Sequence, residues 1–433
     1  MNVKKMTNYT DNVKAQKLWK TLYLCAKESP TRRFHALYDK IYSPDTLREA
    51  WQRVKRKRGS SGVDGQTIEE IVEEYGEDQF LDELYIELKE KNYHPSPVLR
   101  TYILKDNGKN RPLGIPTIKD RVAQMATKMV IEPIFEADFH DCSFGFRPKR
   151  NAHQAMARIR KASKKGFWVV DVDIQGYFDN INQDKLMKLV EQRINDRRVL
   201  KLIRKWLKAG IMEEGNVRNP LTGTPQGGVI SPLLANIYLD TMDQLWEKKF
   251  KHLGEITRYA DDLVIMCRTK QQALESIRAI KGIMMKLDLT LNTEKSKLVN
   301  LWNDEDGFDF LGFHNRKLPY QKKGGWTIYA MSHFPKQEAM KKMRAKIKAF
   351  TEPRSKLHMD LHELVEGLNR RLQGFKNYYR LSPASKKWLN RIDWYVLKRL
   401  ALFNNKKRQR RTLHGHLDEV EKQIQHKLVR LAD

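Results

Sequence analysis

The sequence predicts an α+β fold in which short strands carry acidic side chains and basic helices follow them. Two observations lead to this class. Between residues 68 and about 315, helical patterns alternate with short apolar runs and with loops rich in glycine and proline. After the turn at residues 322–325 and one short strand, the composition shifts to basic helices. With 433 residues, of which 40% are hydrophobic, the chain is long enough for two or three domains with buried cores.

The charge balance indicates a large polyanionic partner. The chain has 82 lysines and arginines against 53 acids, a net charge of +29, and nucleic acid is the commonest partner of such chains. An anionic membrane surface is the rival, but no apolar run approaches the roughly 18 residues that a spanning helix needs. No signal-peptide pattern follows Met1. We therefore expect a cytoplasmic, nucleic-acid-associated protein with no membrane partner.

The cysteines predict neither a zinc site nor a disulfide framework. Cys25, Cys142 and Cys267 are scattered, and no Cys-x-x-Cys pair occurs. We expect them to be buried thiols without a chemical role.

Four segments follow one another along the chain. Residues 1–67 predict a basic, helical N-terminal extension, 68–320 the mixed region, 321–400 basic helices, and 401–433 a basic tail. The basic run at residues 55–58 fits either contact with phosphate or a solvated helix end.

One helix in the third segment shows its buried face clearly. Apolar residues recur at steps of three and four, and lysines and arginines occupy the remaining faces. The apolar residues are Met340, Met343, Ile347 and Phe350. The pattern predicts a helix that packs this stripe inward and presents positive charge outward, so these methionines belong to a core.

The candidate chemistry lies in two acidic elements. Residues 167–174 predict a strand on which Asp171 and Asp173 share one face, because strand side chains alternate. Residues 259–262, Tyr-Ala-Asp-Asp between apolar runs, predict a hairpin whose tip presents adjacent carboxylates. Such carboxylates repel each other, and a divalent cation would relieve the repulsion. Each element alone fits solvated aspartates, but together they predict a two-metal site for phosphoryl transfer.

An ordered set of sequence blocks accompanies these acids. The three principal blocks are residues 170–179, 224–228 and 259–262, and further blocks are residues 111–116, 143–148, 291–296, 310–313 and 374–379. Any one block is a weak signal, but their order is specific. Over about residues 45–400 the chain resembles a reverse transcriptase, and more narrowly the group II intron-encoded reverse transcriptase/maturase family.

The resemblance implies a right-hand polymerase with fingers, palm and thumb. The fingers and an antiparallel palm sheet would occupy residues 68–320, and a helical thumb, or maturase domain, residues 321–400. It implies an RNA-directed DNA polymerase that uses Mg²⁺, deoxynucleoside triphosphates, a DNA primer or target, and group II intron RNA or another RNA template. It also implies maturase activity that promotes intron splicing and mobility.

The resemblance also implies the catalytic residues. Asp173, Asp261 and Asp262 match the catalytic metal-binding acids, and Ile174 belongs to the same metal site. Lys295 matches a lysine proposed to protonate the pyrophosphate leaving group. A surface ion pair with Glu294 or another neighbour fits Lys295 almost as well.

Four further residues match nucleotide-binding positions. Lys105 and Arg111 flank the turn of an expected hairpin and would reach the triphosphate, where the alternative is two exposed turn cations. Phe178 matches an aromatic gate that would clash with a ribose 2′-hydroxyl, and simple core packing is its alternative. Gln226 matches a residue that supports template and nucleotide positioning, and the glycines after it allow close backbone approach.

Two other interpretations of the biology stay open. The chain fits a domesticated reverse transcriptase in host defence or repair, or a maturase whose polymerase site is incidental. Because it ends at Asp433 without a cysteine cluster, we expect the bacterial type that lacks an HNH endonuclease domain. The tail at residues 401–433 fits a rudimentary DNA-binding region or a solvated basic run. The sequence does not indicate the oligomeric state.

Overall fold

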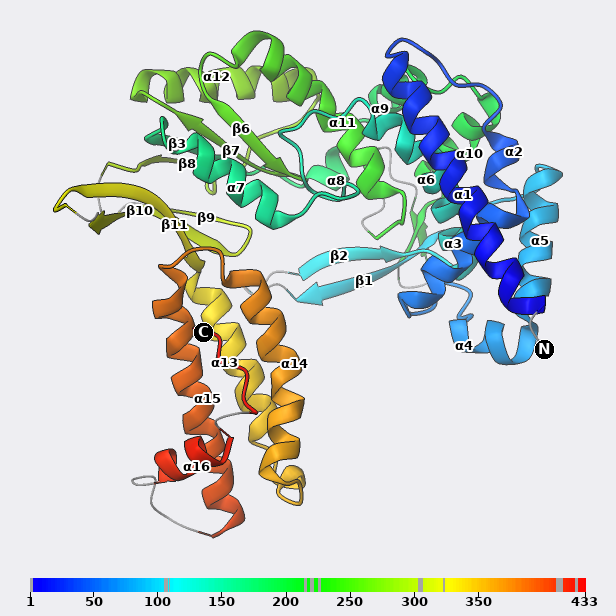
Figure 1. The fold of residues 1–433 in the computed structure, drawn as a ribbon. Helices are drawn as coiled ribbons and strands as arrows, with labels where there is room; N and C mark the ends of the chain where they lie inside the picture. The colour runs from blue at the N-terminus through cyan, green and yellow to red at the C-terminus, as the bar shows by residue number, and fades with distance from the viewer. Residues whose placement is uncertain are drawn as a thin grey trace.

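Three groups of elements make up the molecule: N-terminal helices with a small sheet, a central sheet covered by helices, and a bundle of long helices that projects from it (Figure 1). The computed structural model describes residues 3–104, 108, 110–213, 216–218, 222–224, 227–302, 307–321, 324–409, 416–424 and 427–433. In that order, the three groups correspond to the fingers, palm and thumb that the resemblance implies.

The N-terminal helices pack onto one long fingers helix. They are α1 (Val3–Glu28), α2 (Tyr38–Ile41), α3 (Pro44–Arg56), α4 (Ile68–Glu70), the π-helical turn Ile71–Tyr75, α5 (Glu77–Lys89) and the central α6 (Ile118–Glu136). Ser43 caps α3 by accepting a hydrogen bond from the Thr46 amide, and Trp51 and Val54 bury its inner face. Both α1 and α3 lie against α6. The expected N-terminal extension therefore shares one hydrophobic core with the fingers and palm.

A four-stranded sheet extends from the fingers in the order β2-β1-β4-β5. Its strands are β1 (Val98–Leu104), β2 (Asn110–Ile115), β4 (Ile211–Glu213) and β5 (Asn216–Arg218). β1 and β2 pair antiparallel over their whole length, which confirms the expected hairpin. The hairpin projects from the fingers toward the region between palm and thumb (Figure 1).

The palm is an antiparallel sheet in the order β6-β7-β3-β8. Its strands are β3 (Trp168–Val172), β6 (Glu255–Tyr259), β7 (Asp262–Cys267) and β8 (Lys297–Asn300). The surrounding helices are α7 (Ala152–Ala162), α8 (Tyr177–Asn180), α9 (Gln183–Glu191), α10 (Arg197–Leu207), α11 (Ser231–Leu245), the π-helical turn Trp246–Phe250 and α12 (Lys270–Lys286). The expected antiparallel palm sheet is confirmed.

A second small sheet joins the palm to the thumb. It contains β9 (Phe308–Phe310), β10 (Phe313–Gln321) and β11 (Thr327–Pro335) in the order β11-β10-β9. Gln321 pairs with Thr327, so the boundary proposed between residues 320 and 321 falls within this hairpin. The thumb helices begin only at Gln337.

The thumb is a helical bundle with its own core. It comprises α13 (Gln337–Thr351), the 3₁₀ turn Arg354–Lys356, α14 (Leu361–Tyr379), α15 (Ser385–Lys407) and α16 (His416–Ile424). Met340, Met343 and Ile347 are buried as the periodicity predicted, whereas Phe350 is half-buried.

The C-terminal residues are part of the same bundle. The boundary proposed between residues 400 and 401 lies inside α15, whose buried face continues through Phe403. Val420, Ile424 and Leu431 are buried in the thumb core. The residues described after 401 therefore pack as thumb, because their apolar side chains need the core that α13–α15 provide. Residues 410 and 411 of the basic run lie outside the described residues.

Two expectations from composition can be checked here. None of the helices in the described part of the chain is long and apolar enough to cross a membrane. The three cysteines are free thiols, with Cys142 and Cys267 buried and Cys25 half-buried.

Candidate active site

The two acidic elements lie side by side in the palm sheet. β3 pairs antiparallel with β7, and Val172 lies opposite Leu263. The same register brings Asp173, directly after β3, opposite Asp262 at the start of β7. The residues before Asp173 alternate as predicted, with Val170 and Val172 buried in the core.

Asp261 lies in the tight turn between β6 and β7. Tyr259 pairs with Asp262, so Ala260 and Asp261 form the tip of the hairpin. Ala260 has a φ of +58°, in the left-handed region that costs a residue with a Cβ about 1–2 kcal/mol. Contacts from behind the turn must therefore hold it in place.

The negative charge of Asp173 affects both acids of the turn. Burial raises the pKa of Asp262 to about 6, and the negative charges of Asp261 and Asp173 add to this effect. Burial also raises the pKa of Asp261, with Asp173 contributing and Arg111 and Arg258 counteracting. The pairing of β3 with β7, and of β7 with β6, thus delivers these acids to one region of the palm.

Asp173 and Asp262 border a cavity of about 610 Å³ between the palm sheet and β9–β10. Lys295 and Lys336 line the same cavity, and both favour the charged form of Asp262. The Nζ of Lys295 lies 3.2 Å from Oδ2 of Asp173. Lys295 is thus in the site, and its ion-pair partner is Asp173, not the Glu294 that the surface-pair alternative named first.

A second cavity, of about 520 Å³, lies on the fingers side. Arg111, Phe178, Gly227 and Gly228 line it. Gly227 has a φ of +117°, and a Cβ there would lie 2.3 Å from the carbonyl oxygen of Gly114. Only glycine fits this backbone approach.

Two sequence profiles match adjacent parts of the chain. The profile described as "Reverse transcriptase (RNA-dependent DNA polymerase)" matches residues 103–315. The profile described as "Group II intron, maturase-specific domain" matches residues 340–420. The first runs from the end of β1 through the palm and includes all three acids, and the second covers most of the thumb.

Relatives of known name extend the comparison. Protein YkfC of Escherichia coli is 35% identical over 353 residues, which cover 72% of this chain and 91% of YkfC. The chain belongs to the group II intron-encoded reverse transcriptase/maturase family. "Group II intron-encoded protein LtrA" of Lactococcus lactis is 38% identical over 222 residues, 51% of this chain and 36% of LtrA. This chain therefore matches only about a third of LtrA's length.

A solved structure also shows similarity, although weakly. The "Partial Cas6-RT-Cas1--Cas2 complex" aligns with 57% of this chain and 42% of its own, at 24% identity and a TM-score of 0.36. A likeness at this level carries no argument about partners.

The structure brings together most of the site residues that the sequence predicted for this reverse transcriptase. Arg111 and Phe178 share the fingers-side cavity, and the charge of Arg111 acts on Asp261. Lys105 and Gln226 lie outside the described residues.

Phe178 has features of a core residue and also of the aromatic gate. It is only 9% exposed and makes an edge-to-face contact with Tyr177, yet it lines the cavity. The ring is thus packed from one side and borders open space on the other.

Oxygen donors at Asp173, Asp261 and Asp262 fit a hard divalent cation. Within the described ranges, however, no three histidine, cysteine or carboxylate side chains stand close enough together to hold a metal ion. Asp173 forms its ion pair with Lys295. The buried side chain of Ile174 has no donor atom, so only its backbone carbonyl could contribute.

Asp171 is an acid of this cavity that the predicted site omitted. It lines the same cavity as Asp173 and Asp262. Burial raises the pKa of Asp171 to about 7, and Asp262 and Asp173 add to this, against Lys297. The strand alternation placed Asp171 on the acidic face, and this was the signal that could have included it.

Replacing Asp171 with asparagine should stabilise the protein at pH 8 more than at pH 5. The pKa of Asp171 in the folded protein, about 7, exceeds the roughly 3.9 of an unfolded chain. The contribution of Asp171 to the free energy of unfolding is therefore complete below the pKa of the unfolded chain. It is lost as the pH rises from there through 7. At pH 8 asparagine removes a buried, repelled charge, and we expect the Tm to rise by about 2–4 °C. Thermal unfolding in EDTA measures this, and an equal shift at both pH values would contradict it.

The thumb meets the palm beside this site. Tyr378 donates a hydrogen bond of 2.9 Å to the carbonyl of Leu311, and the rings of Tyr379 and Phe313 are 5.0 Å apart. A groove of about 310 Å³ runs from this contact along α13, where Lys342 and Lys346 line it. The lysines of α13 therefore start beside the cavity that the acids border, because Lys336 lines both this cavity and the groove.

Proposed function

We propose that this reverse transcriptase copies RNA into DNA at the palm face that carries Asp173, Asp261 and Asp262. The observation that supports this most is that Asp173, which is far from Asp261 and Asp262 in the sequence, lies close enough for its negative charge to raise the pKa of both. When bound there, Mg²⁺ would stabilise the negative charge that develops on the transferred α-phosphate and the leaving pyrophosphate.

The chain's own residues would orient the reactants around these acids. Arg111 would engage the triphosphate from the fingers, since its guanidinium can bind phosphate in bidentate fashion. The ring of Phe178 would close the cavity beneath the sugar. Lys295 is 60% exposed on its side chain and can therefore turn from Asp173 toward a leaving pyrophosphate, to which it would supply a proton.

We also propose that the thumb binds group II intron RNA and thereby promotes splicing. The maturase-specific match coincides with α13–α15. On α13 the apolar stripe is buried, whereas the lysines and Arg344 between its members are exposed. A helix of this kind tracks phosphates through charge and needs no side chain that reacts.

Extension of a DNA primer on an RNA template tests the polymerase proposal. Wild-type protein should extend the primer with Mg²⁺ and the four deoxynucleoside triphosphates, and EDTA should stop the reaction. RNA binding without extension under all divalent-metal conditions would favour a maturase with an incidental polymerase site.

RNA affinity should fall steeply with salt. Phosphate contacts release counterions, and each contributes roughly 0.7 to the log–log slope for single-stranded RNA. We expect a slope of at least about 3, measured by fluorescence anisotropy between 50 and 300 mM KCl. The double variant Lys342→Gln/Lys346→Gln should lower it by about 1.4.

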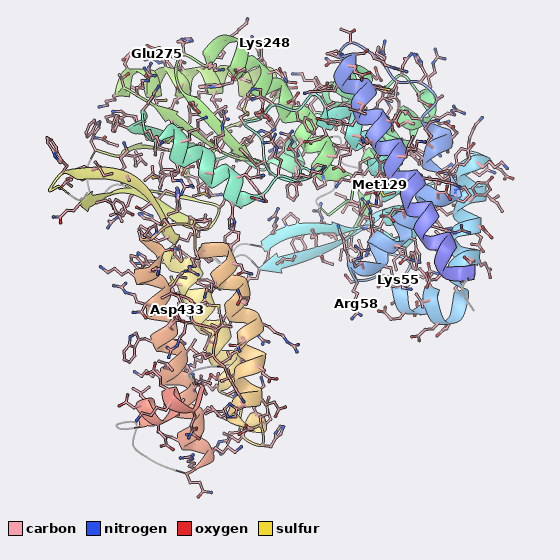
Figure 2. All side chains as sticks on the ribbon, in the orientation of Figure 1. Lys55, Arg58, Met129, Lys248, Glu275 and Asp433 are labelled. Atoms are coloured by element: carbon pink, nitrogen blue, oxygen red, sulfur yellow. The ribbon has the colours of Figure 1, made fainter. Side chains whose placement is uncertain are left out.

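Two exposed lysines at the far end of the palm provide a charge-matched control. Figure 2 shows Lys248 on the side of the palm away from the thumb, whereas Arg58 lies at the edge of the fingers. Lys248→Gln/Lys249→Gln should leave the salt slope unchanged. Equal slopes for all three proteins would show that the α13 lysines do not contact phosphate.

A further inference from the structure

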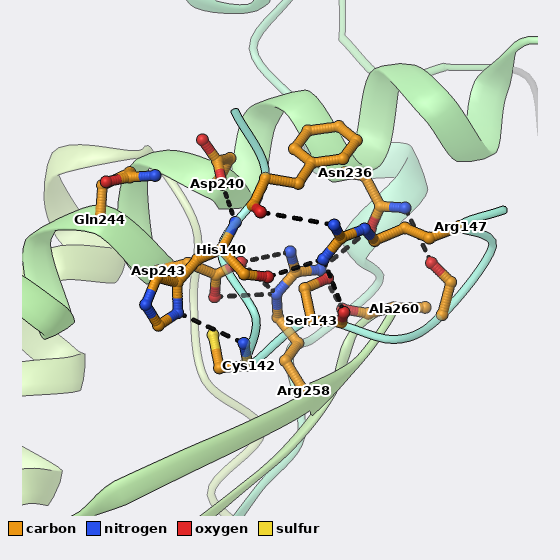
Figure 3. Close-up of polar contacts among 12 residues, drawn as sticks. His140, Cys142, Ser143, Arg147, Asn236, Asp240, Asp243, Gln244, Arg258 and Ala260 are labelled. Atoms are coloured by element: carbon orange, nitrogen blue, oxygen red, sulfur yellow. Dashed lines mark hydrogen bonds and ion pairs between the residues drawn. The ribbon is translucent and has the colours of Figure 1, made fainter. Parts of the chain in front are cut away.

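Behind the catalytic turn lies a fully buried ion pair. Arg258 on β6 and Asp243 on α11 each have side chains with 0% exposure. The Nε of Arg258 donates to both carboxylate oxygens of Asp243 at 3.0 Å (Figure 3). Strong Coulombic attraction therefore holds a positive charge inside the palm, against the cost of burying it.

The other end of the same guanidinium holds the turn. The Nη1 of Arg258 donates to the backbone carbonyl of Ala260 at 2.9 Å and to Oδ1 of Asn236 at 3.0 Å. Ala260 is the residue with positive φ that immediately precedes Asp261. One side chain thus links helix α11 to the peptide group that orients both turn acids.

A loop reinforces the turn from the other side. Asn236 donates from its Nδ2 to the carbonyl of Gly145 at 2.8 Å. Gly145 is pressed against the turn, because a Cβ there would lie 2.4 Å from the Ala260 nitrogen. The amide of Phe144 donates to the carbonyl of Arg258 at 2.9 Å. Asn236 therefore connects the loop, the guanidinium and the turn in one network (Figure 3).

Stability alone does not account for this arrangement. Well-packed apolar residues are often as stable as a buried ion pair, or more stable, because two charges need not be desolvated. What apolar residues cannot supply is a donor aimed at the Ala260 carbonyl. The geometry of that donor is what distinguishes this pair from ordinary packing.

We propose that Arg258, anchored by Asp243 and Asn236, is a positioning residue that fixes the Ala260 peptide and so aims Asp261 and Asp262. This role rests on the proposed function of these acids in metal binding. Because its side chain is fully buried, Arg258 can contact neither substrate nor ion. It acts through the turn, and its charge also favours the ionised form of Asp261. Its loss should therefore reduce the rate of nucleotide addition and divalent-cation affinity, and leave template–primer affinity unchanged.

The double variant Arg258→Met/Asp243→Leu separates positioning from stability. It replaces the pair with apolar side chains, so the folded state should survive, with a Tm close to that of wild type. Misplacing a reacting group by about 1 Å can cost roughly 10²-fold in rate. We expect the single-turnover rate to fall by roughly 10–100-fold, with the Kd for template–primer within a few-fold. Mn²⁺ affinity, measured by electron paramagnetic resonance, should fall in parallel.

Arg258→Lys and Asn236→Ala provide independent variants. Lysine keeps the charge but lacks the fork that reaches Asp243 and Ala260 together. Asn236→Ala leaves the ion pair intact and removes the link to Gly145, so its effect should be smaller. Should the double variant fail to fold, these two decide the question. Wild-type rate and Mn²⁺ affinity in every folded variant would overturn the proposal.

A buried arginine between α9 and α10 is the matched control. The Nε of Arg193 lies 2.9 Å from Asp138, and its Nη2 donates to the carbonyl of Ala26. Arg193→Met/Asp138→Leu should leave the rate and Mn²⁺ affinity at wild-type levels, and an equal loss there would make the effect of Arg258 merely structural.

The Mn²⁺ measurement, with Asp262→Asn as baseline, does not require primer extension. Wild-type protein that binds Mn²⁺ but extends no primer would refute the proposed function alone.

Discussion

Asp262→Asn should abolish primer extension while RNA binding stays within a few-fold of wild type. Asparagine keeps the size of the side chain but removes a negative charge that a divalent cation needs. The charge stabilisation lost is several kcal/mol, which corresponds to a rate reduction of about 10³-fold or more. Asp261→Asn should have the same effect. Single-turnover extension and RNA anisotropy, performed on the same preparations, measure the two properties.

A surface aspartate of the palm is the control for these variants. Asp288 pairs with Lys185 at 2.8 Å on the protein surface. Asp288→Asn should extend primers at the wild-type rate. Extension by Asp261→Asn or Asp262→Asn at a rate comparable with that of this control would show that the metal assignment is wrong.

Phe178→Ala should admit ribonucleotides. The ring borders the cavity that Arg111 also lines, and removing it opens space where a 2′-hydroxyl would otherwise clash. An apolar pocket discriminates against an added hydroxyl by roughly 10²-fold, and we expect the preference for deoxynucleotides to fall by about this factor. The ratio of single-nucleotide incorporation rates for deoxy- and ribonucleoside triphosphates measures it.

The same substitution also tests whether the ring is only packing. Emptying a buried phenylalanine site costs about 3–5 kcal/mol of stability, so the milder Phe178→Val should be compared. Tyr177→Phe serves as the control, because it removes the hydroxyl that bonds the carbonyl of Ala235 and keeps the ring. A lower Tm with unchanged sugar preference would assign Phe178 to the core alone.

Local patterns in the sequence predicted the elements of the site well. The alternation from Val170 to Asp173 placed acids and valines on opposite faces, and the structure confirms this. The apolar runs around Asp261 and Asp262 predicted the hairpin that the register shows. These successes share one reason: a strand or hairpin is decided by side chains two to five positions apart.

Long-range contacts were not predictable in this way. The partner of Lys295 is Asp173, 122 positions away, whereas the sequence suggested Glu294 or another neighbour. Asn236 and Asp243 are buried polar residues of α11, and the sequence of this helix does not indicate which partners they have. The proposed segment boundaries at 320 and 400 fall inside β10–β11 and α15, because composition changes gradually where a hairpin or helix continues.

The sequence by itself determined the acidic strand, the acidic turn, the buried stripe of α13 and the positive charge, since each depends on residue type and local spacing. Only the tertiary structure decided that Asp173 lies opposite Asp262, that Asp171 shares their cavity, and that Arg258 holds the turn from behind. The physical reason is that the whole packed core sets the pairing register and the burial of each side chain. Charged groups from elements far apart in the chain form ion pairs only when that core has formed.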